Sequence, residues 1–288
     1  MAQMKDIKRR ISSVGNIMQI TNAMELVSSA KLRKARRTLE TTRPYYQTVF
    51  QDINELIEMS GDHTSIYLEE RPIKNRAVVV IASDRGLAGG YNINIAKKAI
   101  ELTKKDDGVD TTFYSTGSRI VEILRRAGCK VNRDFTYINE EPTSEDAQSL
   151  GNFLLDRYAR GMVDEVIVVY TRFETVLSLI PEEIKLLPAG GFSEGDEPKV
   201  KKFVDIEFEP SASAVLNQMI KQYVNVTLFG CLLEASASEQ ASRRTAMENA
   251  TQNGDDILKE LQLVYNRARQ ASITQEISEI VGGAEALK

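Results

Sequence analysis

Histidine and cysteine, which supply many metal ligands and catalytic nucleophiles, are almost missing from this sequence. The single histidine, His63, stands beside Gly61 and Asp62 in a polar segment, where we expect a solvated side chain. The two cysteines, Cys129 and Cys231, are far apart and fit no CxxC or metal-binding spacing. The sequence therefore predicts no metal site, and a reducing compartment is the default expectation.

Long apolar runs and tryptophan are also absent. No window approaches eighteen consecutive apolar residues, so we expect no membrane-spanning segment. The formal charge of −4 favours neither an acidic nor a basic partner, and 42% hydrophobic with 27% charged residues is typical of a soluble globular protein. The basic, amphipathic start "MAQMKDIKRR" continues to about Arg43 without a cleavage-like boundary, so we interpret it as mature structure rather than a transit peptide.

Proline is missing from both ends of the chain, before Pro44 and after Pro210. Apolar residues recur there at spacings of three and four, which predicts two long helices, with a bend or restart at Pro44. A continuous helix over the last 75 or so residues would reach roughly 110 Å and would need a partner along its length. The sequence therefore predicts that both termini pair as a hairpin of long helices, with an α/β domain inserted between them.

The middle of the chain has a different period. "RAVVVIAS" (residues 76–83) predicts a strand buried on both faces, and strands and helices alternate after it, which indicates a largely parallel sheet. Thr143 and Asp146 have capping-box spacing at the start of a helix. "GGFSEGDEPKVKK" (residues 190–202) predicts an exposed loop or hairpin tip. The further expected helices cover residues 92–104 and 118–128, and the further strands cover residues 111–116, 164–173 and 175–188.

Small and polar residues occupy positions 235–256, where a two-stranded coiled coil usually carries leucine. One interpretation is a helix that frays or breaks near Gly254. The other is a rod that faces further partners as well as its own mate.

The segment "SDRGLAGGYN" (residues 83–92) follows a strand and precedes a helix, which is the place of a phosphate-binding loop in many α/β folds. It matches neither GxGxxG nor GxxxxGK[ST], so the nucleotide signal is weak and a tight glycine turn is the preferred interpretation. Asp84 with Arg85 and Glu140 with Glu141 have no nucleophile, base or metal cluster beside them. We expect the two glutamates to face water, and we expect no catalytic residue and no cofactor.

The first predicted helix is rich in lysine and arginine, which would suit a nucleic acid. However, it carries no interleaved aromatic residues, and the whole chain is acidic. We therefore prefer a solvated or partner-facing basic stripe. The basic residues are Lys5, Lys8, Arg9, Arg10, Lys31, Arg33, Lys34, Arg36 and Arg37.

Three stretches together resemble the γ-subunit family of rotary ATP synthases, in its bacterial form. They are "IKRRISSVGNIMQITNAMELVSSAKLRKA" near the start, "SDRGLAGGYN" in the middle, and "LKELQLVYNRARQASITQEISEIVGGAEAL" at the end. The resemblance runs from residue 2 to residue 287 in the same order. "ITQEISEIVGGA" is the most diagnostic stretch.

This resemblance implies an α/β fold with a long antiparallel α-helical coiled coil formed by both termini and an inserted Rossmann-like domain. The coiled coil, residues 1–60 and 209–288, would be a rotor shaft, and residues 61–208 would be the foot. The shaft would turn inside a ring of alternating α and β subunits and couple ion flow through the membrane c-ring to ATP synthesis or hydrolysis. The implied location is peripheral, on the cytoplasmic face of the bacterial inner membrane.

The resemblance also implies which residues contact partners. Met24 and Arg243 match the contacts near the β lever loop and would face one another, which puts Ile20 near Met247 and Met1 near Asn266. Polar contacts to the β catch region match Arg269, Gln270, Thr274 and Glu276. An apolar sleeve would cover Ile273, Ile277, Ile280, Val281 and Leu287, which lie in a final stretch of some twenty residues that projects as a single helix. The ε subunit and the c-ring would meet the foot near "VDIEFEP" (residues 204–210).

Two other functions suit parts of the sequence. A nucleotide-binding α/β enzyme could use residues 83–92 with the helices as a dimerisation arm, and a coiled-coil scaffold or nucleic-acid binder could use the basic helix. ATP binding by the isolated chain would favour the first, and salt-sensitive DNA binding the second.

Overall fold

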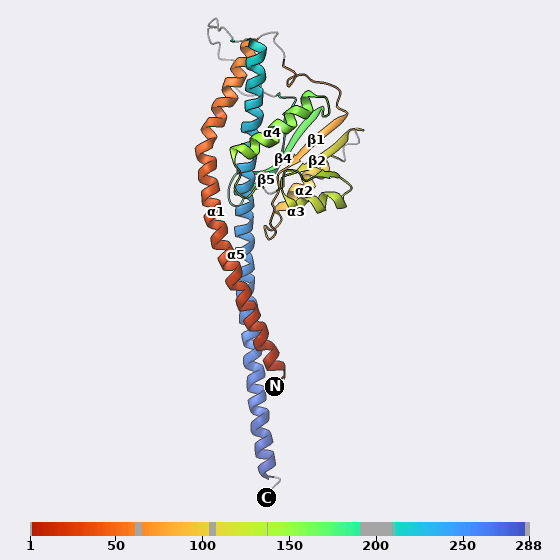
Figure 1. Cartoon of the computed structure of the whole chain (residues 1–288). Coiled ribbons are helices and arrows are strands. Elements are labelled where there is room, and N and C mark those ends of the chain that lie inside the picture. The colour runs from red at the N-terminus through yellow and green to blue at the C-terminus, as the bar shows by residue number, and fades with distance from the viewer. Residues whose placement is uncertain are drawn as a thin grey trace. The chain divides into compact units, whose positions relative to one another are not determined.

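Two very long helices carry the ends of the chain in the structure, a computed structural model that describes residues 2–60, 65–103, 108–136, 138–190, 209 and 211–285. Helix α1 (Ala2–Ser60) has 59 residues and continues through Pro44, where the sequence predicted a bend or restart. Helix α5 (Ala212–Glu285) has 74 residues and passes Gly254 without the break that was one interpretation of its polar seam (Figure 1).

A five-stranded sheet lies between these helices in the sequence. Its order is β3-β2-β1-β4-β5, with the first four strands parallel and β5 antiparallel to β4. Central strand β1 pairs Val80 with Ser115 of β2 and with Val169 of β4. The strands are β1 (Asn75–Val80), β2 (Asp110–Ser115), β3 (Lys130–Asn132), β4 (Glu165–Phe173) and β5 (Leu179–Leu187).

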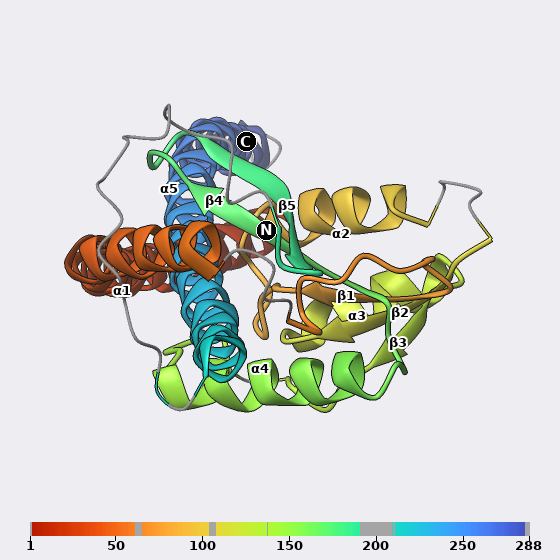
Figure 2. The ribbon, with the colours of Figure 1, turned by 90° about the horizontal axis from the view of Figure 1, so that it is seen from above.

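Helices cover both faces of the sheet, which is why β1 is buried on both faces from Arg76 to Val80. Residues 77, 79 and 81 share one apolar cluster with α4 (Ser144–Ala159) and the first half of α5. Residues 78, 80 and 82 share the other with α2 (Tyr91–Glu101) and α3 (Ser118–Arg126). Figure 2 shows α4 and α2 on opposite sides of the sheet.

The predicted capping box begins α4. The Thr143 side chain accepts from the Asp146 backbone N–H, and the Asp146 carboxylate accepts from the Thr143 backbone N–H. Each interaction satisfies an N–H group that would otherwise be unpaired at this helix start.

The contacts divide the chain into two units, which we describe separately. Unit 1 contains residues 1–29 and 243–288, and unit 2 contains residues 30–242 with the whole sheet. No helix in the described ranges is long and apolar enough to cross a membrane.

The fold class predicted from the sequence is confirmed, with one element missed. Strand β3 has only three residues, "KVN", and offers no periodic signal. His63, the loop at residues 191–202, residues 204–208, Met1 and Leu287 lie outside the described residues, and so do residues 61 and 208 at the predicted domain boundaries. The division into shaft and foot stays a prediction.

Candidate partner-binding surfaces

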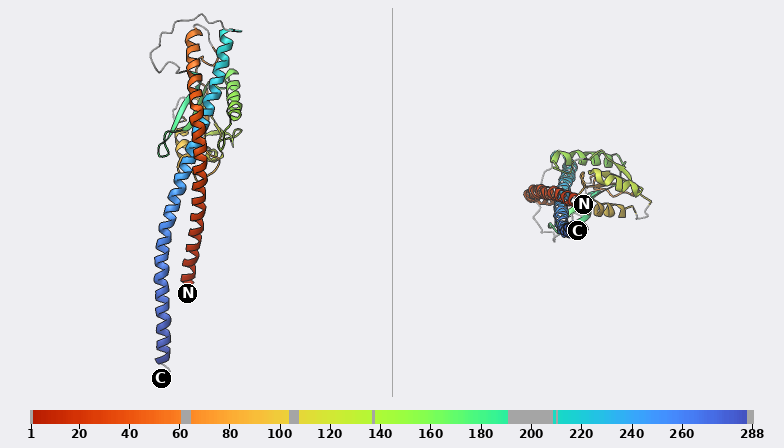
Figure 3. Two further views of the ribbon diagram at one scale, coloured as in Figure 1. Left: turned by 90° about the vertical axis from the view of Figure 1, so that its left-hand side faces the viewer. Right: turned by 90° about the horizontal axis from the view of Figure 1, so that it is seen from below.

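Unit 1 consists of two antiparallel helical segments side by side (Figure 3). The hydroxyls of Thr21 and Thr251 are 2.8 Å apart and hydrogen-bonded. One turn further along, Met18 packs directly on Gly254, since a Cβ built there would be 2.5 Å from the Met18 Cγ. Small and polar residues thus bring the two helices close without a leucine seam.

These two contacts correct the register expected from the sequence. With Thr21 level with Thr251, Met24 is level with Glu248 rather than Arg243, a shift of five residues or roughly 7 Å along the axis. The expected pairing of Ile20 with Met247 is wrong by the same amount. The difference in register arises at Gly254, because the absence of a side chain there leaves room for Met18. Sequence periodicity does not predict such a contact.

Among the described residues of unit 1, no second helix lies beside the end of α5. In this register Ala2, the first residue of α1, is level with Gln270, so residues 271–285 project as a single helix. The sequence predicted such a projection.

Apolar side chains gather on the exposed surface of unit 1. Of the eighteen large apolar side chains exposed among the described residues, eleven belong to this unit. Four of them, at the projecting end of α5, are 47–71% exposed. Such a concentration marks a surface that a partner covers. The eleven are Ile17, Ile20, Leu26, Val27, Ile257, Leu263, Val264, Ile273, Ile277, Ile280 and Val281.

Most of the predicted contact residues are open to solvent. Six of them lie exposed on α5, where Thr274 donates only to the Gln270 carbonyl of its own helix and Glu276 accepts from Ser272. Met24 is half-buried, and Arg243 is only 7% exposed, so Arg243 offers the least free surface. The exposed six are Arg269, Gln270, Thr274, Glu276, Ile277 and Ile280.

In unit 2 the glycine-rich loop at residues 83–92 uses its polar groups within the chain. The Asn92 side chain accepts from the Ser83 backbone N–H at 3.1 Å, and the Asp84 carboxylate accepts from the first N–H of α3. The Ala88 carbonyl accepts from Ser242 of α5 at 2.7 Å. A phosphate group would have to compete with these bonds, so the loop is better suited to anchoring α5 than to binding a nucleotide.

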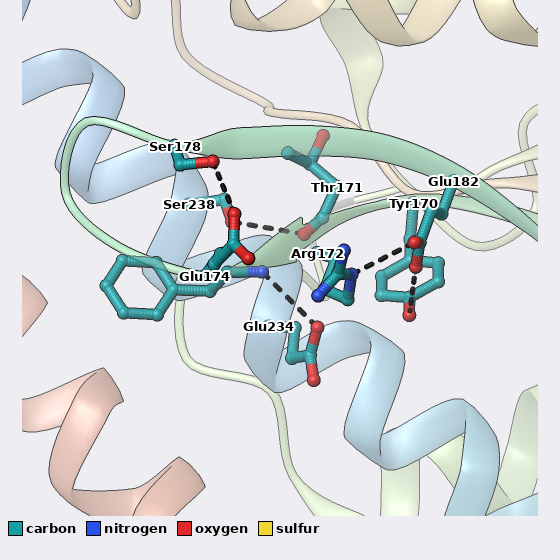
Figure 4. Close-up of polar contacts among 9 residues, drawn as sticks. Tyr170, Thr171, Arg172, Glu174, Ser178, Glu182, Glu234 and Ser238 are labelled. Atoms are coloured by element: carbon teal, nitrogen blue, oxygen red, sulfur yellow. Dashed lines mark hydrogen bonds and ion pairs between the residues drawn. The ribbon is translucent and has the colours of Figure 1, made fainter.

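The β4–β5 hairpin attaches to the same helix (Figure 4). The Glu234 carboxylate accepts from the Phe173 backbone N–H at 3.3 Å, and the Ser238 hydroxyl donates to the Thr171 carbonyl at 3.0 Å. Across the hairpin, Arg172 donates to Glu182 at 3.0 Å. Side chains of α5 thereby pair with backbone groups at the end of β4.

The attachment includes the partly buried carboxyl group of Glu234, whose pKa is shifted. Desolvation raises the pKa of Glu234, while the Phe173 amide and the guanidinium groups of Arg43 and Arg172 oppose the rise. Burial also raises the pKa of the Tyr170 hydroxyl.

Glu141 is exposed to solvent, as expected from the sequence, whereas Glu140 is half-buried, contrary to that expectation. Glu140 pairs with Lys31 of α1 and with Arg85, and Glu141 pairs with Lys34 of α1 at 3.1 Å. Two members of the basic stripe therefore face their own chain. Sequence reasoning missed these pairs because more than a hundred residues separate the partners.

Among the residues that the structure describes, no group of three or more histidine, cysteine, aspartate or glutamate side chains could hold a metal ion. The described part of unit 1 is a rod of two helices with exposed apolar and polar side chains along it.

Comparison with known proteins gives matches along nearly the whole chain. The sequence profile of the family described as ATP synthase matches residues 3–287. The ATP synthase gamma chain of Alkaliphilus metalliredigens is 45% identical over 99% of this chain and 99% of its own length. The sodium ion specific ATP synthase gamma chain of Acetobacterium woodii is 40% identical over 98% of each chain.

Solved structures show the same fold. A chain of the Euglena gracilis mitochondrial ATP synthase rotor superposes with a TM-score of 0.65 at 16% identity, covering 94% of this chain and 99% of that one. A chain of the OSCP/F1/c-ring assembly from the same organism gives a TM-score of 0.69 at 18% identity, covering 99% and 95%.

Proposed function

This chain belongs to the ATP synthase γ-chain family, and we propose that it works as the central-stalk rotor subunit of that enzyme, with no active site of its own. The observation that carries the proposal is the surface of unit 1. A helix pair with eleven exposed large apolar side chains, four of them on a projecting single helix, suits a rod held inside other proteins.

Unit 1 is the part that turns inside the ring of alternating α and β subunits. The apolar end of α5, with Ile277 and Ile280, sits in a sleeve formed by those subunits. Lower on the rod, Arg269, Gln270, Thr274 and Glu276 offer polar groups, while Met24 and Arg243 lie nearer the lever loop of β. The exposure of the six α5 residues supports these assignments.

Mechanical work is transferred between the rotor and the β subunits through contacts that change with the rotor angle. Nucleotides bind between α and β subunits, and the asymmetric rod drives each β subunit in turn through open, loose and tight states. A contact shifts such an equilibrium only by its different affinity for the states. A charge-assisted hydrogen bond contributes about 1.5–3 kcal/mol, which is enough to bias a step and weak enough to release.

The inserted α/β domain within unit 2, residues 61–208, is the foot, which meets the ε subunit and the polar loops of the c-ring. The subunit is peripheral and lies on the cytoplasmic face of the bacterial membrane. Its sheet has no catalytic task, and the internal hydrogen bonds of residues 83–92 support this reading over a nucleotide-dependent enzyme.

Stoichiometry tests the proposal most directly. A tagged chain expressed in its native host should copurify with two larger ATP-binding subunits at one copy per ring of alternating α and β subunits, and the isolated chain should bind no ATP. Micromolar ATP binding by the isolated chain, or a purified complex without the larger subunits, would overturn the proposal.

A further inference from the structure

We propose that Glu140 is a positioning residue that holds α1 against the sheet of unit 2. We further propose that this contact determines how efficiently rotor torque drives ion movement. The inference rests on the proposed function. It concerns residues 31–35 of α1 and the two loops that contact them, which lie entirely within unit 2.

Glu140 uses both oxygens of its carboxylate. Oε1 accepts from the Lys31 ammonium of α1, and Oε2 pairs with the Arg85 guanidinium at 3.1 Å. The side chains of Lys31 and Glu140 are 33% and 34% exposed, so water only partly screens the pair. Glu140 thus bridges α1 and the loop that follows β1.

The backbone that presents Glu140 is fixed by its neighbour, Asn139, which is 2% exposed. The Asn139 side-chain amide donates to the Ala82 carbonyl, and its oxygen accepts from the Thr116 hydroxyl at 2.9 Å. Thr116 directly follows strand β2, and Ala82 is the second residue after β1, the central strand of the sheet. Because the backbone at Glu140 is fixed in this way, its carboxylate can orient α1.

A second loop holds α1 from another side. Leu32 and Ala35 pack in one apolar cluster with residues of the β4–β5 hairpin and of α5. Lys31 and Lys34 share one face of α1, and Leu32 and Ala35 share a face about 100° around the helix. Ion pairs and apolar contacts therefore constrain the rotation of α1 together. We call residues 139–141 and 173–179 the α1 clamp.

Helix α5 is held at the same edge of the sheet by bonds of a different kind. Ser242 donates to the Ala88 carbonyl, Ser238 to the Thr171 carbonyl, and the Tyr91 hydroxyl to the Ala235 carbonyl. The clamp on α1 combines the apolar contacts of Leu32 and Ala35 with ion pairs whose side chains are partly exposed. Because such pairs add little to folding stability, their loss should loosen the orientation of α1 and leave the fold intact.

In the rotor, torque that passes between the foot and the shaft crosses these contacts of α1 as well as the contacts of α5. If α1 moves at the clamp and relaxes before the foot has turned, the energy of that ATP is lost as heat instead of moving ions. ATP hydrolysis would then continue with fewer ions moved per ATP. Glu140 would control coupling without touching nucleotide, ion or another subunit.

Inverted membrane vesicles that contain the assembled complex provide the test. ATP hydrolysis and ATP-driven ion uptake are measured together, uptake with both a proton-sensitive dye and radioactive sodium. Glu140→Lys should keep the ATPase rate and lower the ions moved per ATP by about two- to fivefold, the scale of one partly exposed ion pair. The charge swap Lys31→Glu with Glu140→Lys should restore most of the coupling, since the Arg85 side chain, 73% exposed, can turn to water.

The matched control is Glu122→Lys, which makes the same charge change on α3 at an exposed ion pair with Arg126. It should couple like the wild type. Should Glu140→Lys fail to assemble, Glu140→Gln provides the same measurement with a neutral isostere. Normal coupling in both Glu140 variants, or no rescue by the swap, overturns the inference. A wild-type chain that does not assemble or drive uptake overturns the proposed function instead.

Discussion

Gly254 is buried within α5, although a glycine in a helix costs about 1 kcal/mol relative to alanine. Its position is explained by Met18 of α1, whose Cγ lies 2.5 Å from where a Cβ of residue 254 would stand. Gly15 of α1 is different, because a Cβ built there meets nothing within 4 Å. The same residue type is therefore necessary at one position and replaceable at the other.

Alanine substitutions at the two glycines should have opposite effects on the stability of the chain. Gly15→Ala should raise the stability of the isolated chain by about 0.5–1 kcal/mol, because alanine loses less conformational entropy in a helix. Gly254→Ala should lower stability, because its Cβ would clash with Met18. Thermal unfolding followed by circular dichroism measures both effects.

Adding Met18→Ala to Gly254→Ala provides the control for that clash. The double variant should lose less stability than the sum of the two single variants, because each relieves the same contact. Equal stabilisation by Gly15→Ala and Gly254→Ala would show that the helices of unit 1 pair in another register.

At the scale of one element, α5 changes character along its length. Between Leu216 and Ala241 its apolar residues are buried in the core of unit 2, whereas the residues that follow Gln270 are almost all exposed. At the projecting end, Ile273, Ile277, Ile280 and Val281 still recur at helical spacing. This periodicity has no partner among the described residues of the chain, which is why it indicates a partner subunit.

Replacing Ile277 and Ile280 with aspartate should weaken assembly of the complex. Full burial of two isoleucines contributes about 3–6 kcal/mol, and a buried charge adds a penalty. The yield of complex and the coupling of its ATPase should fall, while the thermal stability of unit 2 stays unchanged. Pull-down of the tagged chain followed by ATPase assays measures both.

Ser278→Asp is the matched control, since it adds the same charge to the same turn of α5. It should impair assembly less than either isoleucine variant. Unchanged complex yield with Ile277→Asp and Ile280→Asp would remove the case for an apolar sleeve.

For the molecule as a whole, the two units differ in where their stability comes from. Unit 2 has a sheet buried by helices on both faces, and the strands β1 and β4 are nearly solvent-free. Within the described part of unit 1, residues 271–285 of α5 have no second helix beside them. Isolated helices of that length are marginal in water, so we expect the projecting end to become ordered only when a partner covers it.

Hydrogen exchange should reveal this gradient. In the isolated chain, amides of β1 and β4 should exchange slowest and those of residues 271–285 within seconds to minutes. In the purified complex the same terminal amides should gain protection, because the partner subunits stabilise the helix. Mass spectrometry of the two samples measures this, and equal protection of β1 and residues 271–285 in the isolated chain would contradict it.

The sequence by itself determined the features that depend on local period and composition: two long helices, alternating strands and helices, the capping box at Thr143, and an apolar end without a mate. These follow from nearest neighbours along the chain, and the structure confirms them. The contact residues from Met24 to Ile280 came from the family resemblance and stay predictions.

Only the tertiary structure decided which distant residues meet. The five-residue shift in helix register depends on Met18 filling the space beside Gly254, and the clamp on α1 depends on Glu140 reaching Lys31 from 109 residues away. Short strand β3 also forms because its neighbour β2 provides a pairing edge. Such contacts produce no periodic pattern in the sequence. The free energy that favours them comes from interactions between distant segments, which meet only in the folded chain.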